Sequence, residues 1–133
     1  MSMNAVMDWE RAARTGLAEA VYAEGKPLSC LADLLEKAAE EKRRLLVTRL
    51  SADAFASLPA RLTGILDYDA LSKTAILGEI PHLPKARVAV VSAGMADASV
   101  AQEVCRTLTF AGVGARQIAD VGVAGLWRLM ARL

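Results

Sequence analysis

The chain has 133 residues, 54% of them hydrophobic and 5% aromatic, and its 16 basic and 15 acidic side chains leave a net charge of +1. This length suits one domain, or one small domain with part of another. The charge balance and the scarcity of aromatic rings argue against a nucleic-acid binder. No apolar run approaches the roughly 20 residues that cross a membrane, and residues 1–10 lack a signal-peptide pattern, so we expect a cytoplasmic protein.

The first 79 residues predict a small α/β region. Pro27 suits the start of a helix, where its missing N–H needs no partner. Leu31, Leu35 and Ala38 then follow at helical spacing. Ser51 is placed to cap a short helix before Pro59. The expected helices cover residues 8–17, 27–42 and 51–58, and the expected strands cover residues 19–24, 45–47, 65–68 and 74–77.

Residues 80–86 are predicted to form a linker, because Pro81 and Pro84 hold the backbone extended. His82 stands between these prolines and is the one histidine of the chain. The two cysteines, Cys30 and Cys105, lack the spacing of a metal motif. We therefore expect no metal site, and we predict buried, reduced thiols rather than a disulfide or a nucleophile.

The pattern changes in residues 87–133. The run Val88-Ala89-Val90-Val91 is typical of a parallel strand buried on both faces. A helix over 98–111, a strand over 117–121 and a helix over 126–133 are expected to follow. This order is typical of a right-handed parallel crossover. Two strands cannot cover their own edges, so the front strands, a partner chain or further sequence must complete the sheet.

The loop over residues 92–97 is the first candidate site, because ligands gather at the carboxyl ends of parallel strands. Ser92 offers a hydroxyl group to a phosphate or ribose, and Gly94 lets a ligand approach the backbone. The helix that follows presents N–H groups to an anion. Asp97 can bind a ribose hydroxyl or move a proton, although a helix-cap role is favoured from spacing alone.

The loop over residues 120–125 is the second candidate site. Gly122 and Gly125 suit a bound phosphate and a ligand-free tight turn equally well. The loop lacks the lysine of a P-loop, so the motif is weak. Asp120 is expected to be a partly buried acid or a partner of backbone amides, and Trp127 is expected in the core or at an interface.

Two shorter polar segments end strands of the first region. Glu24-Gly25-Lys26 and Thr48-Arg49 can meet a ligand, but surface-turn and helix-cap roles are favoured for both. The residues alone thus predict an α/β protein with two candidate anion-binding loops.

Several segments resemble the LarB family of nickel-pincer cofactor carboxylases, which is related to the PurE-type carboxylases of aminoimidazole ribonucleotide. The resemblance begins at Arg14 and spans nearly the whole remaining chain. Its most specific part is the second loop. The matching segments are residues 14–26, Val47-Thr48-Arg49, Tyr68 with Lys73-Thr74, residues 87–94 and residues 118–126.

The resemblance implies an N-terminal α/β region over residues 1–79, and then, over residues 87–133, the first βαβα of a flavodoxin-like parallel-sheet domain. It implies carboxylation of the pyridinium ring of nicotinic acid adenine dinucleotide, with CO2 or bicarbonate as co-substrate and AMP released. It also implies homo-oligomers and no tightly bound cofactor. The residues that carry over are Asp97 as the catalytic group and Ser92, Gly94, Asp120, Gly122 and Gly125 as nucleotide-binding groups.

This chain departs from the family pattern at three positions. Met95 and Ala96 replace two hydroxyl residues of the first loop, and Trp127 stands where the family commonly has histidine. The family's nucleophilic cysteine belongs to a later segment, and Cys105 does not match it. We therefore expect the chain to be inactive alone. A non-enzymatic nucleotide-binding or assembly module is one alternative, and an aminoimidazole ribonucleotide carboxylase of purine biosynthesis is the other.

Overall fold

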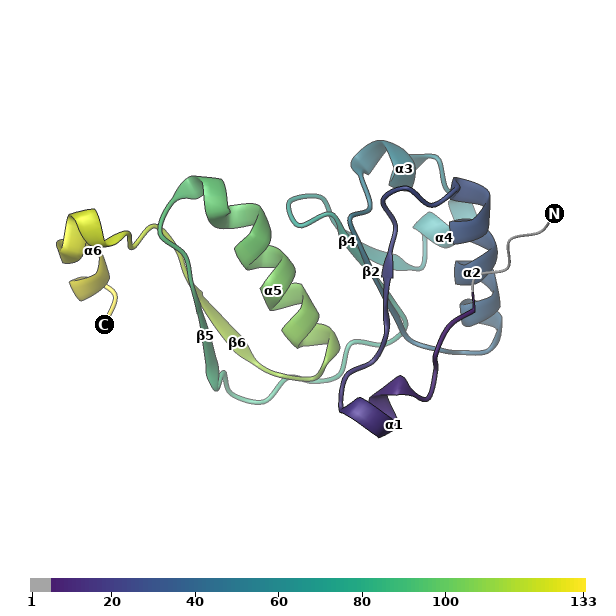
Figure 1. The fold of residues 1–133 in the computed structure, drawn as a ribbon, viewed down its shortest axis with the longest axis horizontal. Coiled ribbons are helices and arrows are strands. Elements are labelled where there is room, and N and C mark those ends of the chain that lie inside the picture. The colour runs from purple at the N-terminus through teal and green to yellow at the C-terminus, as the bar shows by residue number, and fades with distance from the viewer. Residues whose placement is uncertain (1–5) are drawn as a thin grey trace. The chain divides into compact units, whose positions relative to one another are not determined.

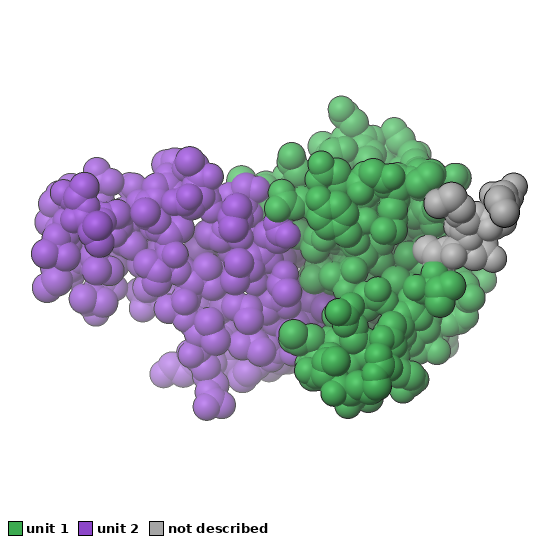
Figure 2. Space-filling view, viewed as in Figure 1, with its two compact units in different colours: residues 1–79 green, residues 80–133 purple. Residues whose placement is uncertain are grey.

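The computed structural model describes residues 6–133. The chain forms two compact units, which divide between Glu79 and Ile80 and are coloured separately in Figure 2. Unit 1, residues 1–79, contains a mixed four-stranded sheet, and unit 2, residues 80–133, contains a parallel two-stranded sheet. The predicted α/β class is therefore confirmed. No helix in the described part of the chain is long and apolar enough to span a membrane.

Unit 1 has four strands and four helices in its described part (Figure 1). The sheet order is β1-β2-β4-β3, in which β1 and β2 are parallel and the other neighbours are antiparallel. The carboxyl ends of β1 and β2 therefore meet at one edge of the sheet. The elements are α1 (Arg11–Thr15), β1 (Ala20–Tyr22), α2 (Leu28–Glu40), β2 (Leu45–Thr48), α3 (Ala52–Ala56), α4 (Ala60–Thr63), β3 (Leu66–Asp69) and β4 (Thr74–Leu77).

The core of unit 1 lies between α2 and one face of its sheet. Leu31, Leu35 and Ala38 of α2 are buried in one cluster with Val21 of β1 and Val47 of β2. Helical spacing places the three α2 residues on one side, so the predicted stripe is confirmed. Strand β1 has one covered face, since its central residue is buried between two exposed neighbours.

Helix α3 begins as the sequence predicts. The Ser51 hydroxyl oxygen accepts a hydrogen bond from the Ala54 N–H at 3.2 Å, which satisfies one unpaired donor of the first turn. Helix α4 was not predicted, because a four-residue helix after Pro59 is too short to show a period. Helix α1 is shorter than the expected helix over residues 8–17 and ends at Gly16, which has a φ of 79°.

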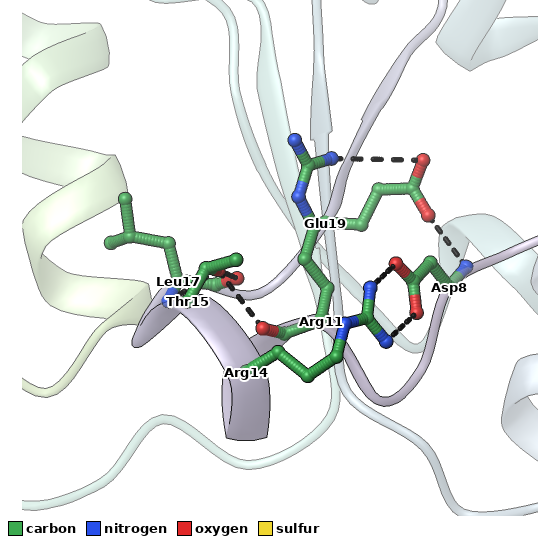
Figure 3. A network of polar contacts seen from close by, with 6 residues as sticks. All are labelled: Asp8, Arg11, Arg14, Thr15, Leu17 and Glu19. Carbon is green, nitrogen blue, oxygen red and sulfur yellow. Dashed lines mark hydrogen bonds and ion pairs between the residues drawn. The ribbon is translucent and has the colours of Figure 1, made fainter.

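A polar network joins the segment before α1 to the start of β1 (Figure 3). The Asp8 carboxylate accepts hydrogen bonds from both terminal nitrogens of Arg14. The Asp8 N–H donates to the Glu19 carboxylate at 2.6 Å, and Arg11 lies 4.0 Å from the same carboxylate. The hydrogen bond from Arg14 lowers the pKa of Asp8. The polar contacts thus hold α1 in place although its own residues are exposed.

Unit 2 contains one strand–helix–strand crossover and a short final helix. Strands β5 and β6 are parallel, with Val88 opposite Ala115 and Val91 opposite Ile118. The second strand begins and ends earlier than the predicted range of 117–121. Its early end is explained by Asp120, which turns the chain with a φ of 59°. The elements are β5 (Val88–Val91), the 3-10 turn Met95–Asp97, α5 (Ala98–Phe110), β6 (Ala115–Ile118), the 3-10 turn Val123–Gly125 and α6 (Leu126–Met130).

The expected burial of residues 88–91 on both faces is wrong for this chain. Val91 is 57% exposed, and Val100 on α5 is 59% exposed. Ala101 and Phe110 are the buried residues of α5. A strand with one neighbour and one packed helix cannot cover all of its apolar side chains, so several of them remain in contact with solvent.

Residues 80–86 contain no helix or strand and belong to the second compact unit. A Cβ atom on Gly114 would lie 2.4 Å from the Pro84 carbonyl oxygen. The Arg87 N–H also donates to the Gly114 carbonyl oxygen at 3.1 Å. Glycine at position 114 thus lets the chain that enters unit 2 pack beside the start of β6.

Candidate functional site

The two loops predicted from the sequence lie side by side at the carboxyl ends of β5 and β6. The Ser92 N–H donates to the Ile118 carbonyl oxygen at 3.0 Å, and the Ser92 carbonyl oxygen accepts from the Val121 N–H at 3.2 Å. The Gly122 N–H donates to the Ala93 carbonyl oxygen at 3.0 Å. The ladder of hydrogen bonds therefore continues past the strands, and it forms one paired-loop site from residues 92–97 and 120–125.

Ser92 is the most distinctive polar residue of the paired-loop site. The residue is only 8% exposed, and its hydroxyl oxygen has no hydrogen-bond partner among residues 6–133. Burying a hydroxyl without a partner costs about 1–3 kcal/mol. A ligand atom that reached this hydroxyl would recover part of that free energy.

Asp97 closes the first loop on itself. Its carboxylate accepts from the Gly94 N–H at 3.1 Å, and its own N–H donates to the Gly94 carbonyl oxygen at 3.1 Å. Asp97 stands at the N-cap position of α5, but its side chain makes no capping bond to that helix. The favoured cap role is therefore confirmed for the 3-10 turn that precedes α5, whose N-cap Gly94 donates to the carboxylate, and not for α5 itself.

The three site glycines differ in what surrounds them. A Cβ atom on Gly122 would lie 3.3 Å from the Ala93 carbonyl oxygen, so glycine allows the close approach of the two loops. A Cβ atom on Gly125 would lie 3.2 Å from the Arg128 Nε atom. A Cβ atom on Gly94 would meet no atom within 4 Å, which leaves open space beside the first loop.

Arg128 is a charged residue of this site that the sequence analysis missed. Its Nη1 atom lies 3.1 Å from the Asp120 carboxylate. Asp120 is exposed and pairs with this arginine, so the expected partly buried acid is wrong. Trp127 is 71% exposed and lies outside the core of unit 2, with the Arg128 guanidinium carbon 5.6 Å from its ring centroid. The sequence signal that could have indicated Arg128 is its place in the short helix directly after the second loop.

The cysteines lie outside the paired loops. Cys30 and Cys105 are both free and half-buried. Burial raises the pKa of the Cys105 thiol, so the reactive thiolate is disfavoured there. Across residues 6–133, no group of three or more His, Cys, Asp or Glu side chains is arranged to hold a metal ion.

The paired loops combine a buried hydroxyl, two carboxylates, a guanidinium and closely spaced backbone. Such groups can hydrogen-bond a ribose and pair with a phosphate or a carboxylate. The site contains no thiol nucleophile. Its chemistry is therefore that of a binding site with one candidate proton-transfer group, Asp97.

Two comparisons with known proteins place the chain in a family. The chain is 32% identical over 133 residues to an uncharacterized protein of Methanocaldococcus jannaschii, in an alignment that covers 96% of this chain and 52% of that protein. The chain thus spans about half the length of the curated relative that it matches. Residues 2–79 match the family model described as the LarB/PurE-like N-terminal domain. Because this match covers more than half of the chain, the chain belongs to the LarB/PurE-like family.

Proposed function

We propose that this chain is part of a LarB-like carboxylase and that its paired-loop site binds a pyridine nucleotide. In the whole protein the reaction is carboxylation of the pyridinium ring of nicotinic acid adenine dinucleotide, with CO2 or bicarbonate consumed and AMP released. Family membership supports the class of protein. The observation that carries the assignment to this site is the buried, unpartnered Ser92 hydroxyl between two loops joined at strand ends.

Each polar group of the site has a role in this proposal. The Ser92 hydroxyl bonds a ribose or phosphate oxygen, and the backbone at Gly94 and Gly122 approaches the ligand closely. The Arg128 guanidinium pairs with a phosphate or carboxylate of the nucleotide. Asp97 is the proposed catalytic carboxylate, since one of its oxygens accepts from the Gly94 N–H and the other remains available for a proton.

In this proposal, the chain alone binds the nucleotide but does not carboxylate it. Cys105 lies on α5, and burial raises its pKa, so it does not supply the nucleophile. The crossover from β5 to β6 is the proposed start of a flavodoxin-like sheet. The exposed Val91 and Val100 are surfaces that further strands or another copy in a homo-oligomer would cover.

The test is a comparison of nicotinic acid adenine dinucleotide affinity between the chain and its Asp97→Ala variant. Loss of the carboxylate opens the Gly94–Asp97 turn and removes a ligand acceptor, so we expect affinity to fall by about tenfold. Asp33→Ala, at an exposed position of α2, is the matched control and leaves affinity unchanged. Equal affinity of Asp97→Ala and Asp33→Ala would remove the first loop from the proposed site.

A non-enzymatic binding module is the second candidate. The observation that favours it is the exposure of Met95 and Trp127, which stand where the family has a hydroxyl residue and a histidine. Restoring both family residues by Met95→Thr and Trp127→His would distinguish the two. Tighter nucleotide binding in the double variant supports part of a carboxylase, because the rest of the site then still fits the nucleotide, and unchanged binding supports the module.

A further inference from the structure

Unit 1 contains a cavity of about 420 Å³ at the carboxyl ends of β1 and β2. Leu28 and Ala54, which are half-buried, give it an apolar wall, and Leu31 and Leu50 lie behind them in the core. The segments that surround it are the turn after β1, the turn after β2 and the turn before β4. A cavity of this size holds a small organic molecule, because ligand pockets occupy about 300–1,000 Å³. We call it the unit 1 pocket.

The sheet topology brings three basic side chains to this pocket. Lys26 follows β1 and Arg49 follows β2, and these two strands are parallel. Lys73 precedes β4, which is antiparallel to β2, so it reaches the same sheet edge from the opposite direction. A hydrogen bond of 2.8 Å from the Leu50 N–H to the Lys73 carbonyl oxygen holds the last two turns together. The convergence is therefore built into the fold.

The charge around the unit 1 pocket is unbalanced. Glu24 is the one acidic residue among its lining residues, and its carboxylate accepts a hydrogen bond from the Tyr22 hydroxyl at 3.0 Å. Neither the Lys26 nor the Lys73 ammonium group forms an ion pair within residues 6–133. The Lys26 and Lys73 ammonium groups repel one another, so a bound anion would lower the free energy of this arrangement.

The backbone at two of the basic residues is strained. Arg49 has a φ of 57° and Lys73 has a φ of 53°, in the left-handed region that costs a residue other than glycine about 1–2 kcal/mol. Glycine at either position would relieve the strain but would remove the cation. Strained positions of this kind concentrate at ligand sites. The strain accompanies the charge and the cavity and does not by itself define a site.

We propose that the unit 1 pocket binds the phosphate group of a small phosphorylated molecule, whose ring or apolar part lies against Leu28 and Ala54. The ammonium groups of Lys26 and Lys73 and the guanidinium of Arg49 are the phosphate ligands, and guanidinium groups suit paired bonds to phosphate oxygens. This site lies wholly within unit 1 and does not include the paired loops, so it does not depend on the function proposed for them.

The test is a titration of the isotope-labelled 133-residue chain with inorganic phosphate and with phenyl phosphate, at constant ionic strength, followed by NMR. We expect saturable shifts of the Gly25, Lys26, Leu50 and Ser51 amide signals. Phenyl phosphate is expected to bind several-fold more tightly than inorganic phosphate, because its ring can cover the apolar wall. Absence of saturable shifts at these amides would overturn the proposal, as would equal affinity for the two probes.

Two glycine variants separate a specific site from general charge. Lys73→Gly removes a ligand cation where glycine fits the backbone, so we expect an unchanged fold and about tenfold weaker phenyl phosphate binding. Lys42→Gly is the matched control: Lys42 has a φ of 54° and does not line the unit 1 pocket. If phenyl phosphate affinity fell equally in the two variants, binding would be due to non-specific charge and the proposed site would be wrong. Shifts confined to the paired loops would contradict this pocket while supporting the other site.

Discussion

Tyr68 connects the hairpin of unit 1 to the wall of the unit 1 pocket. Its hydroxyl donates to the Leu50 carbonyl oxygen at 2.9 Å, and its ring stacks on Phe55 at a centroid distance of 4.1 Å. Tyr68→Phe keeps the stacking and removes the hydrogen bond, so the free energy of unfolding should fall by about 1 kcal/mol in urea denaturation. Tyr22→Phe, at an exposed tyrosine, should change it by much less.

The pH dependence of stability follows from the same hydroxyl. Burial raises the pKa of Tyr68, and the charge of Asp69 raises it further. A raised pKa in the folded state means that the tyrosine contributes stability below its ordinary pKa of 10.0, and that this stability is lost as pH rises above that value. Denaturation curves measured below and above pH 10.0 should therefore show that the free energy of unfolding falls more for the wild-type chain than for Tyr68→Phe.

The sequence predicted the positions of some polar residues in the paired loops but not all of their contacts. Ser92, Gly94 and Gly122 stand directly after apolar runs, and strand ends are where ligands gather, so their positions were predictable. The pairing of Arg128 with Asp120 was not, since it depends on how a short helix follows the second 3-10 turn. The solvent exposure of Asp120 follows from the same local geometry.

At the scale of elements, β1, α2 and β2 were each predictable because their periods are clear, but the parallel pairing of β1 with β2 was not predicted. The burial of β5 was misjudged for a physical reason. An apolar run indicates what a strand can bury, whereas actual burial depends on how many neighbours the strand has. β5 pairs with a single strand in this structure, and the Val100 face of α5 is likewise uncovered.

Substitutions of apolar residues in α2 and α5 should therefore lower the free energy of unfolding by different amounts. Leu35 is fully buried, so Leu35→Ala should lower the free energy of unfolding of unit 1 by about 2–5 kcal/mol. Val104 is 42% exposed, and Val104→Ala should change the stability of unit 2 by less than about 0.5 kcal/mol. Chemical denaturation of the two variants measures both values. A large loss in Val104→Ala would show that this face of α5 is covered in solution.

Gly114 offers a test of how residues 80–86 pack within unit 2. An alanine Cβ would lie 2.4 Å from the Pro84 carbonyl oxygen, so the backbone must shift, and we expect a loss of about 1–3 kcal/mol in unit 2 alone. Gly94→Ala is the control, because its Cβ would meet no atom within 4 Å and its φ of −139° suits any residue. Amide hydrogen exchange, read separately in the two units, reports the change.

At the scale of the whole molecule, the sequence predicted two regions because prolines cluster between two different hydrophobic patterns. It did not predict the unit 1 pocket. Lys26 and Arg49 were each predicted as able to meet a ligand, with surface-turn and helix-cap roles favoured, but they lie far from each other and from Lys73 along the chain. Only the sheet order, with parallel and antiparallel neighbours of β2, brings them to one edge.

The central proposal is that unit 2 binds a pyridine nucleotide at its paired loops; the joined loops carry it, and the family match in unit 1 supports only the class of protein. The most direct measurement is an NMR titration of the isotope-labelled chain with nicotinic acid adenine dinucleotide. We predict saturable shifts at the Ser92, Gly94 and Gly122 amides, with Arg128 side-chain signals moving in parallel. If residues 92–97 and 120–125 show no shifts at millimolar nucleotide, the claim is contradicted.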